Sequence, residues 1–286
     1  MAYQSVFRPG LYQGRTILVT GAGSGIGRCT AHELAALGAK ILMVGRQIPK
    51  LEKVAAEIAE DGGQATFAAL DIRDEDGVRE TVGRFVADHG PIHGLFNNAG
   101  GHFPSSLEKL SKKGWESVIS TDLTGGFLMA REVFIQSMKE HGGAIVNMAA
   151  DMWGGWPGLG HSGAARAAMV NFTETAAIEW AQYGVRVNAV APGLVASSGL
   201  DFNDPAVVKG VLERARLSIP AKRFATESEI SAVVVFLLSE AASFVSGACY
   251  RVDAAASRNT NHPIPDHRCS QPFNGFHRAT LPKVFE

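Results

Sequence analysis

Long apolar runs, paired cysteines and an excess of one charge are all missing from this sequence. No apolar run approaches the roughly 20 residues that a membrane-spanning helix needs, so no membrane association is expected. Cys29, Cys249 and Cys269 are widely separated and form no Cys-x-x-Cys pair, which indicates neither a disulfide framework nor a metal site for zinc. The net charge of −1 gives no electrostatic attraction for nucleic acid. These absences leave an ordinary globular protein.

Targeting signals are also lacking. Residues 1–14 contain no apolar signal core, and the chain ends in Lys283-Val284-Phe285-Glu286 rather than a peroxisomal Ser-Lys-Leu address. We therefore expect a cytoplasmic location. The composition, 46% hydrophobic and 19% charged over 286 residues, is sufficient for a sizeable core in one large α/β domain or two small ones.

A glycine-rich stretch, Thr20–Gly27, lies between a predicted strand and a predicted helix. The strand is Thr16–Val19, which is rich in β-branched residues, and the helix is Cys29–Leu37, which Gly38 ends. Glycines allow the backbone to turn tightly and to approach a pyrophosphate, which then faces the free N–H groups of the helix N-terminus. A tight turn without a ligand would also favour glycine, but the flanking elements favour a dinucleotide-binding loop.

Strands and helices alternate along most of the chain. The predicted strands are Thr16–Val19, Lys40–Val44, Ala65–Leu70, Ile92–Phe96, Ala144–Met148, Val185–Val190 and Ala248–Val252. The helices are predicted at Cys29–Leu37, Ile48–Ile58, Asp74–His89, two stretches within Leu107–Met138, Ser162–Tyr183, Pro205–Leu217 and Glu227–Leu238. Because no repeat or linker interrupts it, this alternation predicts a single Rossmann-type α/β domain over residues 1–258. Its doubly wound parallel sheet would bind ligands at the carboxyl ends of the strands.

The alternating pattern ends at Asn259. The segment 259–286 contains several prolines with scattered charges and aromatic residues, and it supports no helix or strand. We expect an irregular C-terminal extension that packs over the domain or over a neighbouring subunit. Disorder is the alternative that its composition allows.

Several motifs between Leu11 and Asp253 resemble the short-chain dehydrogenase/reductase family in order and spacing. They are Thr20–Gly27, Asp71 after the third strand, Asn97–Gly100, Gly143–Asn147 and Val187–Gly193. The resemblance implies a Rossmann-type domain that binds NAD(P), transfers hydride and assembles as a homotetramer. It assigns cofactor binding to Gly21, Ser24, Gly25, Ile26, Gly27, Arg46, Asp71, Ile72, Asn98, Ala99, Gly100, Arg166, Pro192, Gly193, Val195 and Ser197.

The sequence departs from that family at its usual catalytic set, which is Asn, Ser, Tyr and Lys with the last two spaced Tyr-x-x-x-Lys. At the Asn position this chain has Asp122, and at the Ser position it has Ala149 or Ala150, with Asp151 next. At the Tyr and Lys positions it has Ser162 and Arg166. A later frame, Val170–Glu174, also lacks both Tyr and Lys. We therefore do not carry the ordinary alcohol-dehydrogenase mechanism over to this chain.

The stretch His161–Ala167 resembles instead the trans-2-enoyl-CoA reductase branch of the family, known from peroxisomes, and more loosely the 2,4-dienoyl-CoA reductases. Pro9–Leu11, Ile219–Arg223 and Pro265–His267 extend this resemblance. It implies reduction of the C=C bond of a 2-enoyl-CoA or 2,4-dienoyl-CoA, with the acyl-CoA as the partner. In that reaction negative charge develops on the thioester oxygen. Hydrogen-bond donors aimed at this oxygen supply much of the rate, so a tyrosine acid is less essential than for a ketone.

Five residues are candidates for the chemistry. Arg166 retains a cation that would hold the nicotinamide ribose, unless it is only a surface charge. Ser162, on the same helix face, could donate to the thioester oxygen or serve as an N-cap. Asp122, Asp151 and His161 are candidate proton donors, and each has a structural role as its alternative.

The end of the second strand bears on cofactor choice. It reads Val44-Gly45-Arg46, without the carboxylate that NAD-preferring members use to bind the ribose diol. Arg46 could pair with a 2′-phosphate, so the sequence predicts NADP(H).

The substrate is less well specified. The apolar, glycine-containing loop Met152–Leu159 could line an acyl or isoprenoid pocket with Phe103, Leu194 and Phe202, or it could be packing. Two other functions therefore stay open beside enoyl reduction. One is an alcohol or carbonyl oxidoreductase acting on a fatty or terpenoid substrate with a non-standard proton donor. The other is an NADP(H)-binding protein that has lost catalysis.

Overall fold

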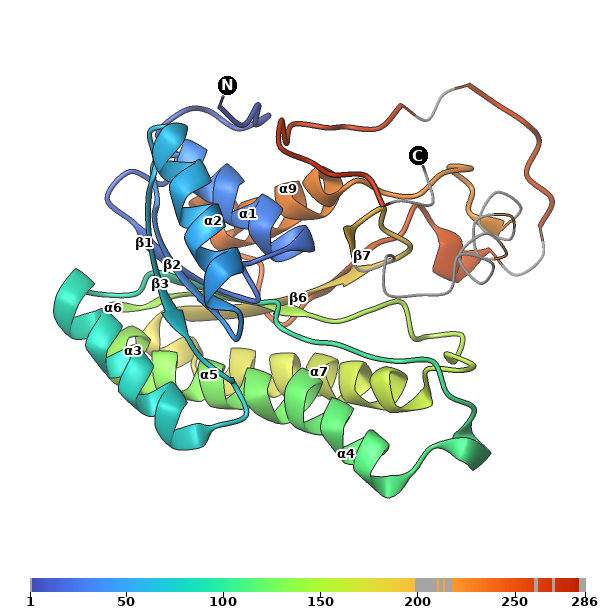
Figure 1. The fold of residues 1–286 in the computed structure, drawn as a ribbon, viewed down its shortest axis with the longest axis horizontal. Helices are drawn as coiled ribbons and strands as arrows, with labels where there is room; N and C mark the ends of the chain where they lie inside the picture. The colour runs from blue at the N-terminus through green and yellow to red at the C-terminus, as the bar shows by residue number, and fades with distance from the viewer. Residues whose placement is uncertain are drawn as a thin grey trace.

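The computed structural model describes residues 2–198, 210, 213, 218–259, 262–268 and 271–282 (Figure 1). The helix predicted over Pro205–Leu217 lies outside the described residues apart from Gly210 and Glu213, and Phe202 and Cys269 lie outside them as well.

Seven parallel strands form one sheet in the order β3-β2-β1-β4-β5-β6-β7. The strands are β1 (Thr16–Thr20), β2 (Lys40–Gly45), β3 (Gln64–Ala69), β4 (Gly94–Asn97), β5 (Gly143–Met148), β6 (Val185–Pro192) and β7 (Cys249–Val252). The order reverses direction on either side of β1, which is the doubly wound Rossmann arrangement that the sequence predicts. The predicted fold is therefore confirmed.

Helices cover both faces of this sheet. They are α1 (Gly25–Ala36), α2 (Ile48–Glu60), α3 (Glu75–His89), α4 (Lys112–Ile119), α5 (Gly126–Val133), α6 (Lys139–His141), α7 (Gly160–Glu179) and α9 (Glu227–Leu238). Figure 1 shows α1, α2 and α9 on one face and α3, α5 and α7 on the other. Within the described residues, no helix has the length and apolar character to cross a bilayer.

Alternation along β1 explains why both faces are covered. Ile17 and Val19 pack into the core beneath α1, α2 and α9, whereas Leu18 packs into the core beneath α3, α5 and α7. All three side chains are 0–1% exposed. A strand buried on both faces reads as a continuous apolar run, which is why the sequence pattern identified it.

Several helical boundaries differ from the prediction. α1 begins at Gly25 rather than Cys29, because glycines in its first turn hide the apolar period. The two stretches predicted within Leu107–Met138 are a short 3-10 turn at Leu107–Lys109 and a longer helical stretch. The longer one runs from Lys112 to His141 through π-helical turns at Ser120–Gly125 and Phe134–Met138. Gly125 there is a packing residue, since a Cβ on it would lie 2.7 Å from Ile72.

Residues 271–282 of the C-terminal segment lie against α1, α2 and α9. Phe276 is 2% exposed, and its ring centroid lies 4.9 Å from that of His32 and 5.9 Å from that of Tyr3. Its backbone N–H donates to Ser228 Oγ at 3.1 Å. This aromatic side chain therefore joins the C-terminal segment to the N-terminal arm and to α1.

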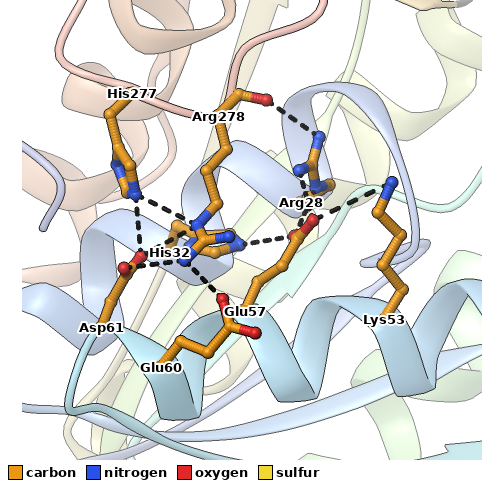
Figure 2. Close-up of polar contacts among 8 residues, drawn as sticks. All are labelled: Arg28, His32, Lys53, Glu57, Glu60, Asp61, His277 and Arg278. Carbon is orange, nitrogen blue, oxygen red and sulfur yellow. Dashed lines mark hydrogen bonds and ion pairs between the residues drawn. The ribbon is translucent and has the colours of Figure 1, made fainter. Parts of the chain in front are cut away.

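Ion pairs continue this attachment beside Phe276 (Figure 2). Arg278 Nη2 pairs with Glu60 at 2.9 Å and with Asp61 at 3.0 Å, and His277 Nε2 lies 3.0 Å from Asp61 Oδ2. Arg28 Nη1 donates to the backbone oxygen of Arg278 at 3.3 Å. Polar and apolar contacts together hold these residues on the chain's own surface.

Replacement of Phe276 by alanine should lower the free energy of unfolding by about 3–5 kcal/mol, because it empties a buried aromatic site. Urea denaturation measures this loss. Phe244→Ala is the matched control, since Phe244 is fully exposed and its truncation should change stability by less than about 0.5 kcal/mol. Equal stabilities of the two variants would show that the Phe276 contacts contribute nothing.

Glu227 is a buried carboxyl at the start of α9. It is 8% exposed and packs near the first turn of α1, where a Cβ on Gly25 would lie 3.9 Å from its Oε1. Burial raises the pKa of Glu227 to about 7, while the charge of Arg28 acts in the opposite direction.

Stability should therefore depend on the ionisation of Glu227. Its folded pKa lies above its unfolded pKa, so its contribution is fully present below pH 4.5 and is lost as the pH rises through 7. We expect the free energy of unfolding to fall by about 2–3 kcal/mol from this group over that window. Glu227→Gln should flatten the decline in urea titrations, whereas Glu52→Gln, at an exposed site on α2, should not. Parallel curves for the wild type and Glu227→Gln would contradict this.

Candidate active site

A cavity of about 470 Å³ opens along the carboxyl edge of the sheet. It extends from the loops after β2 and β3, past the glycine-rich loop after β1, to the loop after β4 and to α7. The predicted cofactor residues that line it are Gly21, Ser24, Gly25, Ile26, Arg46, Asp71, Ile72, Asn98, Ala99, Gly100, Arg166 and Ser197.

Close backbone approach shapes the centre of this cavity. Gly21 has a φ of +65°, and a Cβ on it would lie 2.9 Å from Asn98 Nδ2, while a Cβ on Gly27 would lie 2.5 Å from the same atom. Asn98 Nδ2 donates to Thr20 O at 2.9 Å, and Thr20 Oγ1 accepts the backbone N–H groups of Asn98 and Ala99. Gly27 therefore packs the loop rather than lining the cavity, and the N-terminus of α1 faces the open space.

Cations surround the cavity beside β2 and β3. Arg46, Lys50 and Arg73 all line it there, and a Cβ on Gly23 of the glycine loop would lie 3.0 Å from Lys50 Cβ. Arg73 Nε donates to Asp71 Oδ1 at 2.9 Å, and hydrogen bonds from Arg73 lower the pKa of Asp71 to about 2. The sequence reading missed Lys50 and Arg73, because helix-surface and loop cations carry no motif.

Arg166 and Asp122 form a buried ion pair at the other end. Arg166 Nη2 lies 3.1 Å from Asp122 Oδ2, and these side chains are 9% and 0% exposed. Arg166 Nη1 donates to Met148 O at 2.7 Å, and Asp122 Oδ1 accepts the N–H of Gly101 at 2.8 Å. Asp122, in the π-helical turn before α5, does not line the cavity, whereas Arg166 does. The carboxylate thus fixes the guanidinium at the cavity wall.

His102 lines the same end, and the sequence reading missed it. It follows the glycines after β4, and its ring centroid lies 5.7 Å from that of Trp156. His102 is exposed, but neighbouring groups desolvate its ring in part, and this lowers the pKa of His102. Asp122 raises that pKa, and Arg166 and His161 lower it further. A lone histidine in a loop gives no sequence signal of such a position.

Ser162 and His161 lie inside the protein rather than on the cavity wall. Ser162 is the third residue of α7 and is 1% exposed. Because the N-cap of α7 is Leu159, the alternative of Ser162 as N-cap is wrong. His161 is fully buried, its ring lies 4.7 Å from that of Phe103, and neither of its ring nitrogens has a hydrogen-bond partner.

Asp151, Pro192 and Gly193 lie beside the cavity without lining it. Burial and the nearby Asp253 raise the pKa of Asp151, and Arg251 lowers it. Its N–H donates to Pro192 O at 3.2 Å, and the N–H of Gly193 donates to Val252 O at 3.1 Å. β6, predicted over Val185–Val190, extends further and ends at Pro192.

Val195, the remaining predicted cofactor residue, also lies outside the cavity lining. It forms a β-bridge with Ala225, and its carbonyl accepts the N–H of Ser197 at 3.0 Å. The segment after Ser198 lies outside the described residues, so this side of the site is described only as far as that residue.

The loop Met152–Leu159 is held from two sides. Arg251 Cζ lies 3.6 Å from the centre of the Trp153 ring, and Ser105 N–H donates to Gly158 O at 2.8 Å. Phe103, Trp153 and Leu194 are each about 40% exposed on loops after β4, β5 and β6. Apolar surface therefore gathers at the edge where ligands are expected.

These residues fit a dinucleotide. The glycine loop leaves room for a pyrophosphate at the N-terminus of α1, cations line one end, and Arg166 offers donors at the other. All four tyrosines lie in the described part of the chain, and none lines this cavity. Over the same described ranges, no group of three or more His, Cys, Asp or Glu side chains is placed to hold a metal ion.

Comparison with known proteins places this geometry in a family. The family described as Enoyl-(Acyl carrier protein) reductase matches residues 21–256. A probable 2,4-dienoyl-CoA reductase of Bacillus subtilis is 34% identical over 244 residues, which cover 84% of this chain and 95% of that protein.

Solved structures of similar fold are also dehydrogenases. A citronellol catabolism dehydrogenase of Pseudomonas aeruginosa PAO1 is 58% identical with a TM-score of 0.81, covering 89% of this chain and 100% of the other. A gluconate 5-dehydrogenase from Beutenbergia cavernae, with NADP bound at low occupancy, is 36% identical with a TM-score of 0.79. The match covers 87% of this chain and 99% of the other. With a family match over most of its length, the chain belongs to the short-chain dehydrogenase/reductase family of oxidoreductases.

Proposed function

We propose that this protein is an NADPH-dependent reductase of the C=C bond of a 2-enoyl-CoA or 2,4-dienoyl-CoA. The observation that carries the proposal is the two-ended cavity. Arg46, Lys50 and Arg73 make one end cationic, and His102 and Arg166 line the other. A phosphorylated dinucleotide suits the first end, and a substrate that develops negative charge on oxygen suits the second.

The chain's own residues have separate tasks in this proposal. Backbone N–H groups of the glycine loop and of the α1 N-terminus bind the pyrophosphate, and Arg46 binds the 2′-phosphate. Arg166, held by Asp122, donates both to the nicotinamide ribose and to the thioester oxygen. When bound, NADPH supplies the hydride. Exposed apolar side chains on the edge loops cover the acyl chain and exclude water.

The absence of tyrosine from the cavity lining favours a thioester over a ketone. Reduction of a ketone needs a proton on the oxygen, and positioned proton transfer contributes about 10²–10⁴-fold. An enolate of a thioester can instead be stabilised by hydrogen-bond donors, at roughly 10²–10³-fold each. The relative named 2,4-dienoyl-CoA reductase supports the same choice.

A specific observation supports a second candidate function, which is oxidation or reduction of a terpenoid. The 58% identical structure carries the name of a citronellol catabolism dehydrogenase, and citronellol is a terpenoid alcohol. Oxidation or reduction at the oxygen of a terpenoid is therefore the competing activity. It would use the same cofactor end of the cavity and the same apolar loops.

We also propose the homotetramer that the family resemblance implies. Phe127, Ile135 and Ile178 are 37%, 54% and 79% exposed on α5, the turn after it and α7. The Phe127 and Phe172 rings lie 5.9 Å apart, so α5 and α7 are neighbours. Light scattering of the purified protein tests whether this apolar surface is a subunit contact.

The function is tested by NADPH oxidation with crotonyl-, decenoyl- and decadienoyl-CoA, beside citronellal and matched ketones. The proposal predicts turnover of thioesters at least about tenfold above that of the carbonyl compounds. Turnover of carbonyls alone would establish the competing activity instead. Tight NADPH binding without turnover of any substrate would indicate a binding protein that has lost catalysis.

Arg46→Ala should weaken NADPH binding by about 10- to 100-fold and leave NADH binding unchanged, because it removes a charge-assisted contact to the 2′-phosphate. Fluorescence titration with both dinucleotides measures the two affinities. Arg84→Ala, at an exposed position on α3, is the control and should alter neither. An unchanged preference for NADPH in Arg46→Ala would overturn the assignment of Arg46.

A further inference from the structure

A reduction must end with a proton on the substrate, and the cavity end beside β4 and β5 offers few sources. Among the described residues that line this end, only His102 and Arg166 are titratable, and Arg166 cannot release its proton. The hydroxyls of Thr121, Ser197 and Ser198 also line the cavity, but a neutral alcohol is a very weak acid. Among the described residues that line this end, His102 is therefore the candidate proton donor.

The other acids considered from the sequence are placed less well. The Asp122 carboxylate is paired with Arg166 and lies behind the wall. His161 and Ser162 are 0% and 1% exposed and do not line the cavity. Asp151 lies outside the lining, on the loop side of β5.

We propose that His102 is the catalytic proton donor of this active site, an inference that rests on the proposed reduction. The substrate gains hydride, with its electron pair, at the β-carbon as NADPH becomes NADP⁺. The electrons of the C=C bond move onto the thioester as an enolate. His102 then gives the proton of one ring nitrogen to the α-carbon, and its neutral ring regains a proton from solvent. One NADPH and one proton are consumed for each C=C bond.

The surroundings of His102 suit this task. Desolvation and the charges of Arg166 and His161 make its imidazolium a stronger acid, and Asp122 opposes them from behind Arg166. The ring centroid of Trp156, on the loop after β5, lies 5.7 Å from that of His102. His102 and Arg166 line the same cavity. The proposed proton donor, His102, and the cation that would bind the enolate oxygen, Arg166, thus lie on the same wall of the cavity.

The test compares the wild type with His102→Gln and His102→Ala in single turnovers of NADPH-loaded protein with the thioester that the wild type reduces. We expect the rate to fall about 10²–10⁴-fold in both variants. The wild-type rate should decline as the pH rises above the pKa of His102, up to tenfold per pH unit, and the decline should be absent in His102→Gln. Added imidazole should restore part of the rate of His102→Ala.

Further measurements distinguish a chemical role of His102 from a structural one. NADPH affinity and the urea midpoint should be unchanged in both His102 variants, and NMR titration of the wild type should place the His102 pKa below its usual value. His141→Gln, at an exposed position of α6, is the control and should retain full rate and pH dependence.

The outcomes distinguish the two proposals. If the wild type reduces the thioesters and His102→Gln does so at an equal rate and with the same pH profile, the assignment of His102 is overturned and the proposed function stands. If the wild type binds NADPH but reduces no thioester, the proposed function fails, and the assignment of His102 fails with it.

Discussion

The buried pair of Arg166 and Asp122 is the interaction on which the active-site end of this protein depends. An arginine that is 9% exposed needs a counter-charge, because an unpaired buried charge costs several kcal/mol. Asp122 supplies it from a π-helical turn, and the same carboxylate accepts the N–H of Gly101 after β4. A Cβ on Gly100 would overlap the Arg166 guanidinium. The pair thus joins α7, the α4–α5 turn and the β4 loop at one point on the cavity wall.

The rest of the site follows from the order of the strands. Parallel strands direct their carboxyl ends to one edge, and β1 stands where the strand order reverses, so its glycine loop lies at the middle of the cavity. Residues after β2 and β3 then form the cationic end, and residues after β4 and β5 form the end with Arg166 and His102. The topology thus brings two distant groups of side chains to one cavity.

Sequence patterns were sufficient for the fold, and they identified many of the residues that line the cavity. Buried parallel strands read as apolar runs, and glycine spacing marks close backbone approach, as at Gly21 and Gly27. Contacts between distant segments could not be read in this way. Lys50, Arg73 and His102 have no local motif, and the pairing of Asp122 with Arg166 joins positions that the sequence offered only as separate candidates. The attachment of Phe276 to Tyr3 likewise joins opposite ends of the chain.

The central claim is that Asp122 acts through Arg166, and a double-mutant cycle on NADPH affinity tests it most directly. Asp122→Asn and Arg166→Gln remove the two charges while retaining most of the side-chain volume. The account predicts that each single variant weakens binding and that Asp122→Asn has no further effect once Arg166 is glutamine. Losses that simply add in the double variant would contradict it, because they would show that Asp122 acts independently of Arg166.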